Sequence, residues 1–566
     1  MRYRNELSDQ WRSEIDAGIA WLQNHQNDDG GFGDTDRSHS NIATSYLVLA
    51  ASTLATECGR PGLSQQSRDD LQEWLDTAGG LPALRARYGT DQTFVVPILT
   101  NMAIAGLVPW TEVAQLPFEA AVLPQSWYRF VGLPVVSYAI PALVAIGQAR
   151  FFAGHHAWSP ISWLRRATVR RTLATLLRMQ PSSGGYLEAT PLTAFVTMAL
   201  ASSGRGDHPV ALAGLRFLKD SQREEGAWPI DTNLATWVTS LAVNALRADP
   251  EDDRAWCTDT WRSWHLRCQH RQQHAFTGAQ PGGWGWTDLS GAVPDADDTP
   301  AALIAIMASE TADAADCRQA CEQGADWLLR LQNRDGGWPT FCRGWGTLPF
   351  DRSSTDLTAH ALRALRGFRI WTRGGSDRRI ERAMNRGAAF LAEKQREDGA
   401  WLPLWFGNQD NPDDENPIYG TSRVLLDAGG VLSPNAIASG TEHLLRSQNP
   451  DGGWGGGASL TGQNAASEHA SSLKLPPTSS VEESALALEA LASLHDSLPA
   501  DLRNPTRLAI LRGVRWLTES VADGRHRTAW PIGFYFAKLW YYEDLYPLIF
   551  ACAALGRVLQ HEPHLR

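Results

Sequence analysis

Apolar residues recur along this chain three and four positions apart, the spacing that places them on one face of an α-helix. Residues 357–362 and 485–488 show the pattern clearly, and turn-forming residues separate such segments along the chain. Runs that alternate apolar and polar residues, as half-buried β-strands do, are nearly absent. The pattern therefore predicts an all-α protein.

One phrase occurs six times: a glutamine, three residues, a glycine, one residue and an aromatic residue. A leucine stands four positions before each glutamine, where it faces the core one turn before a helix ends. The Asp, Asn and Gly residues within the phrase supply a helix stop and a turn. Each unit is predicted to be a helical hairpin, which buries its apolar face only by stacking on neighbours. The phrases begin at Gln26, Gln180, Gln222, Gln332, Gln395 and Gln448.

The spacing of the phrases favours closed barrels over an open solenoid. Successive glutamines are separated by 154, 42, 110, 63 and 53 residues, whereas a solenoid would keep the spacing regular. Long inserts suit α/α barrels (toroids) whose loops build an interior cavity. A chain of 566 residues is also too long for one ordinary core, so two domains are expected.

Composition limits the function. The chain has 62 acidic and 51 basic residues, a net charge of −11, which argues against nucleic acid as a partner. It has 24 Trp against 17 Phe and 11 Tyr, although Trp is normally the scarcest aromatic residue. This excess indicates either a repeat that carries Trp at a fixed position or a cavity lined with indole rings.

The cysteines indicate reduced thiols in a cytosolic protein, and the hydropathy of the chain indicates neither a signal peptide nor a membrane-spanning helix. The seven cysteines are scattered, and although Cys317 and Cys321 would share a helix face, no His or second Cys pair completes a zinc pattern. The polar N-terminal segment lacks the apolar core of a signal peptide. The most apolar stretch, residues 133–147, contains two prolines and is too short to span a bilayer. No transmembrane helix is expected.

The strongest chemical signal is an acidic run before an apolar, helix-like segment. Asp295, Asp297 and Asp298 fall within four residues, followed by Thr299 as the expected helix N-cap and Pro300 as the expected first helical residue. Like charges this close cannot all ionise cheaply once water is excluded, so one carboxyl should keep its proton near neutral pH. A buried, protonated carboxylic acid can act as a Brønsted acid.

The repeats and the run Asp295-Ala296-Asp297-Asp298-Thr299 together resemble the class II terpene cyclases, and in detail the squalene–hopene cyclases. The resemblance implies an inserted, degenerate α/α barrel over residues 16–221 and a second barrel formed by residues 1–15 and 222–566. It also implies an apolar chamber, no metal or other cofactor, and peripheral attachment to the cytoplasmic face of the membrane. A homodimer is compatible with it.

The resemblance also implies roles for the catalytic residues. Asp297 matches the proton donor, with Asp295 and Asp298 as flanking carboxylates. The stretch 353–360 is similar to the family segment whose histidine hydrogen-bonds the donor, which makes His360 that partner and Asp356, one turn earlier, its orienting residue. Tyr419 matches a tyrosine near the donor.

Aromatic faces stabilise a carbocation without forming a bond to it, by about 2 kcal/mol or more each when desolvated. The family matches that carry such a wall are Trp286, Trp237, Trp405, Tyr138, Tyr535 and Tyr542. Leu539 and Pro531 stand where the family usually has aromatic residues that face the late cations.

These features predict an isomerase-type enzyme, a class II terpene cyclase that protonates a linear isoprenoid polyene such as squalene or a related triterpene. The alternative within the same chemistry is cyclisation of a prenyl diphosphate or a prenylated aromatic acid. A diphosphate would need magnesium and a basic pocket, for which the candidates are Asp69 with Asp70 and the arginines at positions 165, 166, 170 and 171. Protein prenyltransferase β-subunits share the toroid but need a zinc site, and a non-catalytic repeat scaffold has no use for the acid.

Overall fold

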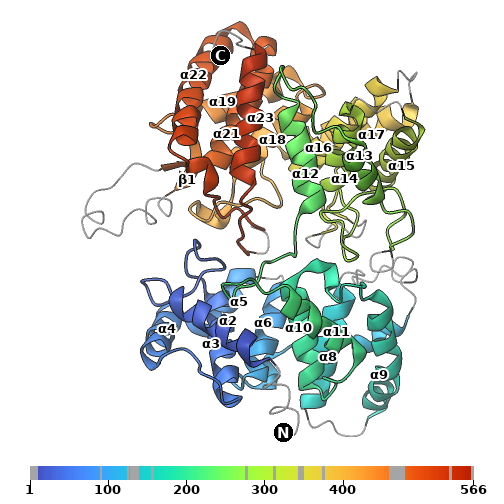
Figure 1. Cartoon of the computed structure of the whole chain (residues 1–566), viewed down its shortest axis with the longest axis vertical. Coiled ribbons are helices and arrows are strands. Elements are labelled where there is room, and N and C mark those ends of the chain that lie inside the picture. Colours follow the sequence, from blue (N-terminus) through green and yellow to red (C-terminus); the bar gives the residue numbers. More distant parts are fainter. Residues whose placement is uncertain are drawn as a thin grey trace. The chain divides into compact units, whose positions relative to one another are not determined.

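The computed structural model describes residues 11–89, 92–123, 127, 139–154, 159–274, 278–309, 314–341, 350–372, 377–457, 478–534 and 538–561. The chain forms two compact units, each described here by itself. Unit 1 comprises Met1–Asn233, Ala275–Gly278 and Leu289–Ala292, and unit 2 comprises Leu234–His274, Ala279–Asp288 and Val293–Arg566. Both units are built almost wholly from helices (Figure 1), as the apolar spacing predicted.

Unit 1 surrounds a core made by its most apolar helices. Helix α3 packs on α6, and α10 packs on both α6 and α8, while α4, α9 and α11 each pack against one of these core helices. The elements of unit 1 are α2 (Arg12–Asn24), α3 (Ile42–Glu57), α4 (Gln65–Thr77), α5 (Gly80–Tyr88), α6 (Gln92–Ile104), η1 (Trp110–Glu112), η2 (Phe118–Val122), α8 (Ile140–Ala153), α9 (Pro160–Met179), η4 (Tyr186–Glu188), α10 (Thr190–Ser202) and α11 (Pro209–Asp220).

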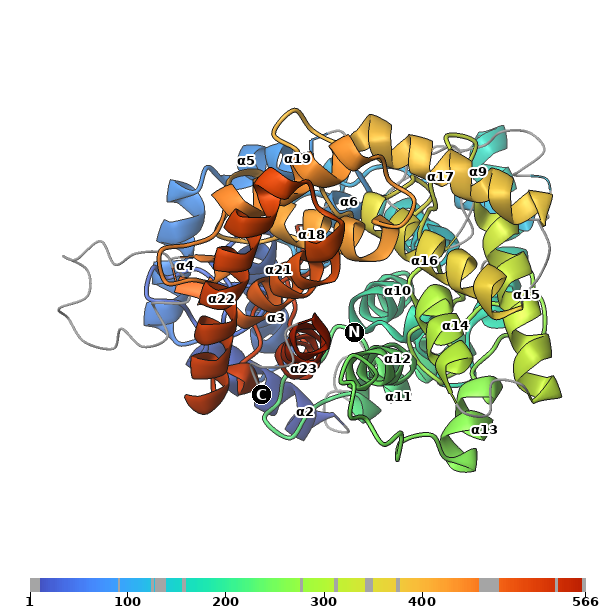
Figure 2. The same ribbon diagram turned by 90° about the horizontal axis from the view of Figure 1, so that it is seen from above.

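Unit 2 contains a closed ring of inner helices. In the order α12, α14, α16, α18, α21 and α23, each helix packs on the next, and α23 returns to α12 (Figure 2). The outer helices α15, α17, α19 and α22 each cover the inner helix that precedes them in the chain. The bounds are α12 (Ala235–Leu246), α13 (Asp259–Arg267), α14 (Asp298–Ala308), α15 (Ala315–Leu331), α16 (Thr355–Trp371), α17 (Arg378–Lys394), α18 (Pro417–Ala428), α19 (Pro434–Arg446), α21 (Val481–Leu494), α22 (Ala500–Ala522) and α23 (Tyr546–His561).

Short elements join these helices. The strands β1 (Trp454–Gly457) and β2 (Thr478–Ser480) pair antiparallel, with Trp454 opposite Ser480. The single-turn helices of unit 2 are η5 (Pro412–Asp414), η7 (His495–Ser497) and η8 (Arg525–Arg527). The ring of α12 to α23 confirms the predicted α/α barrel in this unit.

The repeated phrase acts as a clamp between hairpins. The Gln332 side-chain nitrogen donates to the Gly336 carbonyl at 2.7 Å and to the Ala383 carbonyl of the next outer helix at 2.9 Å. The indole nitrogen of Trp338 donates to the Leu328 carbonyl at 2.9 Å and so satisfies the helix end. Gly336 has a φ of +98°, and a Cβ there would lie 2.4 Å from a backbone oxygen of α17, so only glycine fits.

A seventh clamp, at Gln269, does not follow the repeated sequence phrase. Gln269 makes the same two hydrogen bonds, to Gly282 at 2.8 Å and Ala320 at 3.0 Å, and the indole of Trp284 donates to the His265 carbonyl at 2.9 Å. Here the glycine follows the glutamine by thirteen positions instead of four, which hid the phrase. The clamp fixes Trp284 immediately before the acidic run.

The units differ from the predicted domain boundaries. The structure places the described residues before Asp16, and those from Gln222 to Asn233, in unit 1. The clamp explains the grouping, because the Gln222 side chain donates to the Glu14 carbonyl at 2.9 Å and to the Gly226 carbonyl at 2.9 Å. This contact ties α2 to the chain that follows α11.

The six described cysteines are free thiols. Within the described ranges, every helix is too short or too polar to cross a bilayer.

Candidate active site

The acidic run leads into α14, an inner helix of unit 2. Asp295 is buried, and its Oδ1 accepts the backbone N–H groups of Asp297 at 2.8 Å and Asp298 at 2.7 Å. These two bonds cap the helix, which therefore begins at Asp298 with Asp297 at the N-cap position. The predicted N-cap, Thr299, is wrong: it lies inside the helix, and its hydroxyl accepts the Trp284 N–H at 2.9 Å.

Burial changes the acidity of the two flanking carboxyls. It raises the pKa of Asp295 to about 7, although hydrogen bonds from Asp298 and the helix start oppose the shift. Burial also raises the pKa of Asp298 well above its usual value, and the negative charge of Asp295 adds to the rise. The two side chains hydrogen-bond to each other, so they share a proton near neutral pH.

Asp297 is oriented differently from its neighbours. Its side chain keeps 23% of its accessible surface, whereas Asp295 and Asp298 keep about 4%. Its Oδ1 lies 2.8 Å from Nδ1 of His360, which is buried on α16. With hydrogen on Nδ1 the imidazole donates to Oδ1, so Oδ2 remains to carry a transferable proton.

The edge of the Trp237 indole lies against the His360 ring, with ring centroids 6.1 Å apart. The structure therefore brings the predicted donor and its predicted partner together.

Asp356 and Tyr419 both lie next to this pair but do not bond to it directly. Asp356 accepts the Ser354 hydroxyl and the Leu404 N–H, the latter at 3.3 Å, rather than a hydrogen of His360. Burial raises the pKa of Asp356 to about 6. Tyr419 is buried near the start of α18, where burial raises the pKa of its phenol well above the usual value.

A buried charge cluster beneath these residues was missed by the sequence analysis. Asp427 on α18 accepts Arg363 of α16 at 2.9 Å and forms an ion pair with Arg423 at 2.9 Å. The Asp427 side chain has no accessible surface and that of Arg423 keeps 10%. Burial raises the pKa of Asp427, but the two arginines outweigh this effect and hold it below its usual value.

Two of the predicted wall residues, Trp237 and Trp286, are joined by a backbone hydrogen bond, and the Trp237 ring also contacts His360. The Trp237 indole nitrogen donates to the Tyr546 hydroxyl at 2.8 Å, and the Trp286 carbonyl accepts the N–H groups of Thr236 and Trp237 at 3.0 and 3.1 Å. These bonds hold Trp286, at the end of its loop, against the first turn of α12. Figure 1 shows α12 and α14 in the same unit.

Trp405 belongs to a second aromatic group. The Trp405 indole nitrogen donates to the Thr340 hydroxyl at 3.3 Å, and the Thr340 carbonyl accepts the Ala296 N–H at 2.7 Å. Phe534 packs edge-on against Trp405, with centroids 4.5 Å apart. Tyr542 is half-buried in the segment before α23. Tyr138 and Tyr535 lie outside the described residues.

Further aromatic residues, which the motif matches did not identify, connect the two groups. The Phe406 ring packs 4.3 Å from that of Tyr419 and 6.1 Å from that of Tyr546. Both Phe406 and Tyr546 are buried. Sequence alone offered only the aromatic richness of their segments as a signal.

The candidate diphosphate-binding residues do not form a site in the described parts of unit 1. Asp69 and Asp70 lie on α4, where they accept the side-chain amides of Gln65 and Gln66 at 2.8 and 2.7 Å. Arg165 pairs with Glu119 at 3.1 Å. The remaining arginines of the cluster project from the exposed face of α9.

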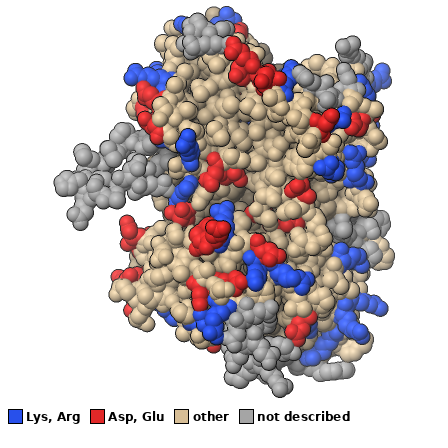
Figure 3. Space-filling model, in the orientation of Figure 1, with Lys and Arg blue, Asp and Glu red and all other residues tan. Residues whose placement is uncertain are grey.

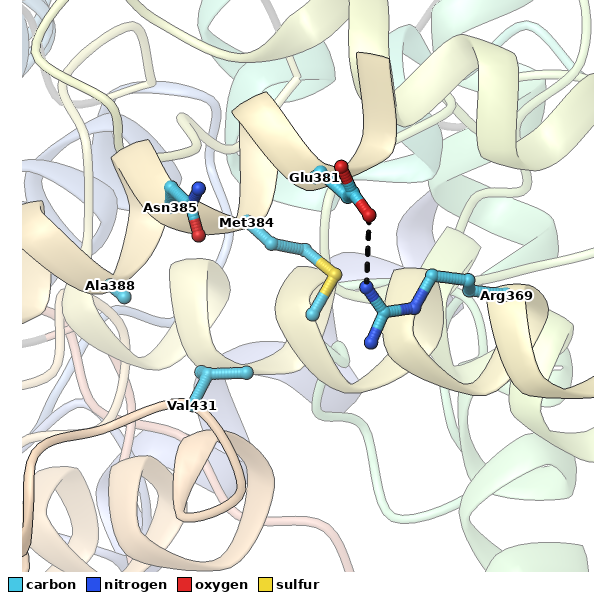
Figure 4. Close-up of a pocket in the computed structure, with 6 residues that line it drawn as sticks. All are labelled: Arg369, Glu381, Met384, Asn385, Ala388 and Val431. Atoms are coloured by element: carbon cyan, nitrogen blue, oxygen red, sulfur yellow. Dashed lines mark ion pairs between the residues drawn. The ribbon is translucent and has the colours of Figure 1, made fainter. Parts of the chain in front are cut away.

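A surface pocket in unit 2 is separate from the acid. It has a volume of about 330 Å³ and lies beside the outer helix α17, where Arg369 and Glu381 form an ion pair at 4.0 Å (Figure 4). Its lining is Arg369, Glu381, Met384, Asn385, Ala388 and Val431. None of the predicted site residues is among these.

The geometry around α14 supports one kind of chemistry. Asp297 is accessible and is hydrogen-bonded from behind, while its neighbours share a proton and carry little charge. Such an acid can release a proton because a donor stabilises the carboxylate that remains. The rings around it offer faces to a cation but only weak nucleophiles.

Comparison with known proteins places this arrangement in context. A model of the squalene–hopene cyclase C-terminal domain matches residues 233–560, and a model of the prenyltransferase α/α toroid domain matches residues 4–78. A terpene cyclase–glycosyl transferase fusion protein of Humicola fuscoatra is 25% identical over 646 residues, which cover 95% of this chain and 45% of the relative. Squalene–hopene cyclase of Alicyclobacillus acidocaldarius is 27% identical over 370 residues, which cover 51% of this chain and 56% of the relative.

The chain thus spans about half the length of these curated relatives. Among solved structures, the ent-copalyl diphosphate synthase from Streptomyces platensis aligns with a TM-score of 0.54 at 18% identity. The alignment covers 97% of this chain and 95% of that one. At this identity the likeness is one of fold.

Proposed function

The chain belongs to the squalene–hopene cyclase family, whose C-terminal domain model matches residues 233–560, and we propose that it is a class II terpene cyclase. It protonates the terminal double bond of a linear isoprenoid polyene and closes the resulting carbocation into rings. The observation that carries the proposal is the accessible carboxyl of Asp297, bonded from behind by buried His360 at 2.8 Å.

In the first step, Oδ2 of Asp297 gives its proton to one alkene carbon. The π electrons form the new C–H bond, the other carbon becomes a tertiary cation, and Asp297 becomes a carboxylate. His360 donates to Oδ1 and stabilises that carboxylate. Asp295 keeps the donor in place through the Asp297 N–H, and the proton shared with Asp298 limits the negative charge nearby.

The cation then moves along the chain as each remaining alkene attacks it and forms a carbon–carbon bond. In this proposal Trp237, whose ring contacts that of His360, and Trp286 face the first cations. Trp405 and Tyr542 belong to the wall that faces later cations. Tyr138 and Tyr535, which lie outside the described residues, remain cation-facing candidates from the motif match alone. The cascade ends when a proton is lost to a base or when water adds to the cation.

Asp356 and Tyr419 support the donor pair in this proposal. Their nearest partners, Ser354 and Leu404 for Asp356 and the Phe406 ring for Tyr419, favour positioning roles. Tyr419 contributes a phenol that stays protonated at neutral pH.

We propose that squalene or a related triterpene is the substrate, and that a prenyl diphosphate is the alternative that a direct assay decides. The purified protein is incubated separately with squalene, farnesyl diphosphate and geranylgeranyl diphosphate, and products are analysed by gas chromatography and mass spectrometry. A cyclic hydrocarbon or alcohol from squalene supports the proposal. A cyclised diphosphate formed only from the shorter substrates moves it to the alternative, and an acyclic outcome with all three contradicts it.

We propose that the protein attaches peripherally to the cytoplasmic face of a membrane and takes its apolar substrate from the bilayer. Helix α9 supports this, because its first turns expose Ile161 (64%), Trp163 (61%) and Leu164 (46%). Arg166, followed by further arginines at 170 and 171, continues the exposed surface of the helix. Exposed indole and aliphatic side chains beside arginines are typical of helices that lie in a membrane interface.

On the face drawn in Figure 3, the basic and acidic side chains of the described residues are interspersed, and no large basic patch is visible there. This distribution agrees with a weak membrane attachment that depends on α9. Sedimentation with vesicles of anionic phospholipid tests the attachment. The wild-type protein should sediment with them, and a variant with Ile161→Ser and Trp163→Ser should remain in solution. Equal sedimentation of both would contradict the role of α9.

A further inference from the structure

Glu188, a buried residue of unit 1, has an unusual backbone conformation. It ends the short helix η4, where Leu187 and Glu188 have left-handed φ angles of +58° and +51°. Residues other than glycine are strained in this region, because the Cβ crowds a carbonyl oxygen. A glycine would make the same turn without strain. The contacts of the Glu188 side chain therefore have to offset the strain, and strain held in this way is common at functional sites.

Glu188 joins three segments of unit 1. Its Oε1 accepts the Ser183 hydroxyl at 2.7 Å and the Gly291 N–H at 2.6 Å, and its carbonyl oxygen accepts the Thr232 N–H at 3.1 Å. The residue has no accessible surface, and Oε2 has no hydrogen-bond partner among the described residues. A buried carboxyl with one oxygen unpaired lowers stability, so packing alone does not explain its presence.

The segment that contains Gly291 is the tip of the loop that leads to the acid. This acid loop (residues 284–295) is closed at its base, where the Asp295 N–H donates to the Trp284 carbonyl at 3.0 Å. Its tip, Leu289–Ala292, is grouped with unit 1, although the residues on either side belong to unit 2. The acid loop is thus held at its base and, separately, at its tip.

Two neighbouring residues hold the tip. The Ser290 hydroxyl accepts the Ser182 hydroxyl at 2.9 Å and the Ser183 N–H at 3.2 Å. At the next position a Cβ would lie 2.6 Å from Oε1 of Glu188 and 2.9 Å from its backbone nitrogen, so only glycine fits at Gly291. The close approach lets the Gly291 N–H reach the buried carboxyl.

The third segment leads into α12. The N–H and the hydroxyl of Thr232 both donate to the Glu188 carbonyl, at 3.1 and 3.3 Å, shortly before α12 begins at Ala235. Within α12 the Trp237 N–H donates to the carbonyl of Trp286 in the acid loop at 3.1 Å. Glu188 therefore binds both segments from which the first wall residues follow.

The protonation of this cluster does not weaken the contact. Burial raises the pKa of Asp231 to about 8, and the charge of Glu188 adds to the rise, so Asp231 is mostly neutral at pH 7. Burial also raises the pKa of Glu188, although the bonds from Ser183 and Gly291 oppose the shift. Whether Glu188 is ionised or carries a proton on Oε2, its Oε1 accepts the same two hydrogens.

We propose that Glu188 is a positioning residue that anchors the tip of the acid loop and thereby fixes Trp286 and the acidic run. The inference rests on the proposed function, in which Asp297 protonates one alkene carbon and Trp286 faces the first cations. Proton transfer to a single carbon requires an accurately aimed acid, and a displacement of about 1 Å lowers the rate strongly. Glu188 acts through the Gly291 N–H.

The first test follows backbone hydrogen exchange by mass spectrometry and needs no turnover. Glu188→Ala removes the acceptor, and exchange of the amides in residues 284–298 should become faster by about tenfold. Glu188→Gln keeps an oxygen at the Oε1 position and should exchange as the wild type does. Gly291→Ala keeps the carboxyl but displaces the contact, so it should reproduce the faster exchange of Glu188→Ala.

Glu483 in unit 2 offers a matched control. It is also fully buried, and one of its oxygens accepts the Gly456 N–H at 2.6 Å and the Ser480 hydroxyl at 2.5 Å. Glu483→Ala should speed exchange around Gly456 and leave the acid loop at the wild-type rate. Faster exchange of the acid loop in this control to the same extent would show a general loosening and overturn the inference.

The second test measures turnover of squalene in detergent micelles. In Glu188→Ala and Gly291→Ala, kcat should fall by about 10–100-fold, because the acid is no longer aimed, while KM changes by less than about twofold. Mono- and bicyclic products should increase, because Trp286 is displaced with the loop. Glu188→Gln should restore both the rate and the product profile.

A structural role confined to unit 1 predicts a different result. Glu188→Ala would then unfold at a lower temperature but keep the exchange of the acid loop and the product profile of the wild type, and this outcome would overturn the inference. If Glu188→Ala does not fold, Gly291→Ala decides alone, and wild-type exchange of its acid loop would overturn the inference. Absence of any cyclic product from the wild-type protein would refute the proposed function, whereas the exchange test of the anchor would still hold.

Discussion

Replacing Asp298 by asparagine should make the protein more stable at alkaline pH. Burial and the neighbouring carboxyl raise the pKa of Asp298, and burial raises that of Asp295 to about 7. In the folded state these groups bind protons more tightly than in the unfolded chain. The cost of ionising Asp295 is therefore absent below pH 4, grows as the pH rises, and is complete above about pH 7.

The magnitude follows from the pKa of Asp295, which rises from 3.8 to about 7. A rise of about three units corresponds to about 4 kcal/mol of unfolding free energy lost between pH 4 and pH 8. In Asp298→Asn one acid is gone, and the new amide can donate to Asp295. The repulsion between the Asp295 charge and the Asp298 carboxyl disappears, so the variant should gain about 2 kcal/mol over the wild type at pH 8.

The assay is thermal unfolding by circular dichroism, from pH 4.5 to pH 8.5 at a fixed scan rate. The variant should match the wild type near pH 4.5 and unfold a few degrees higher at pH 8. Asp501→Asn, the same change at an exposed position on α22, should leave the pH profile unchanged. A destabilised Asp298→Asn at pH 8, or a profile parallel to that of the wild type, would refute the shared-proton argument.

Three further predictions concern catalysis. His360→Ala removes the imidazole that hydrogen-bonds Asp297 and should lower kcat by about 10²–10³-fold, since water replaces the imidazole only in part. Turnover by the folded variant at the wild-type rate would show that the 2.8 Å contact is not catalytic. Trp286→Ala removes a face for early cations and should release mono- or bicyclic products while substrate is still consumed; an unchanged product profile in mass spectrometry would assign Trp286 to packing. EDTA should leave cyclisation of a hydrocarbon polyene unchanged, because protonation by a carboxylic acid needs no metal; a loss restored by added magnesium would favour the diphosphate alternative.

The fold could be predicted because its unit is local. A glutamine, a glycine and an aromatic ring at fixed spacing make the same hydrogen bonds wherever they recur, as Gln332 and Trp338 do. The clamp at Gln269 was missed because its loop is longer by nine residues. The unit boundary also depended on a contact distant in sequence, from Gln222 to Glu14, that no local pattern reveals.

In the candidate site, too, residues in local sequence motifs could be predicted, whereas contacts that depend on tertiary packing could not. Asp297 and His360 stand in recognisable motifs, and the structure places them 2.8 Å apart. Arg423 and Asp427 instead read as an ordinary i,i+4 charge pair, which on most helices faces solvent. Only the packing of α18 inside the ring shows that the pair is buried. The bonds of Asp356 to Ser354 and Leu404 likewise depend on a neighbouring loop.

The most direct test of the central proposal, that Asp297 delivers the initiating proton, is a comparison of wild type and Asp297→Asn in heavy water. The two proteins are incubated with the substrate that the wild type accepts, and the product is examined by mass spectrometry. The wild type should give a cyclic product with one deuterium at the carbon protonated first. The asparagine variant, folded by circular dichroism, should return the substrate unchanged. Cyclic product from Asp297→Asn at a rate near that of the wild type would contradict the account.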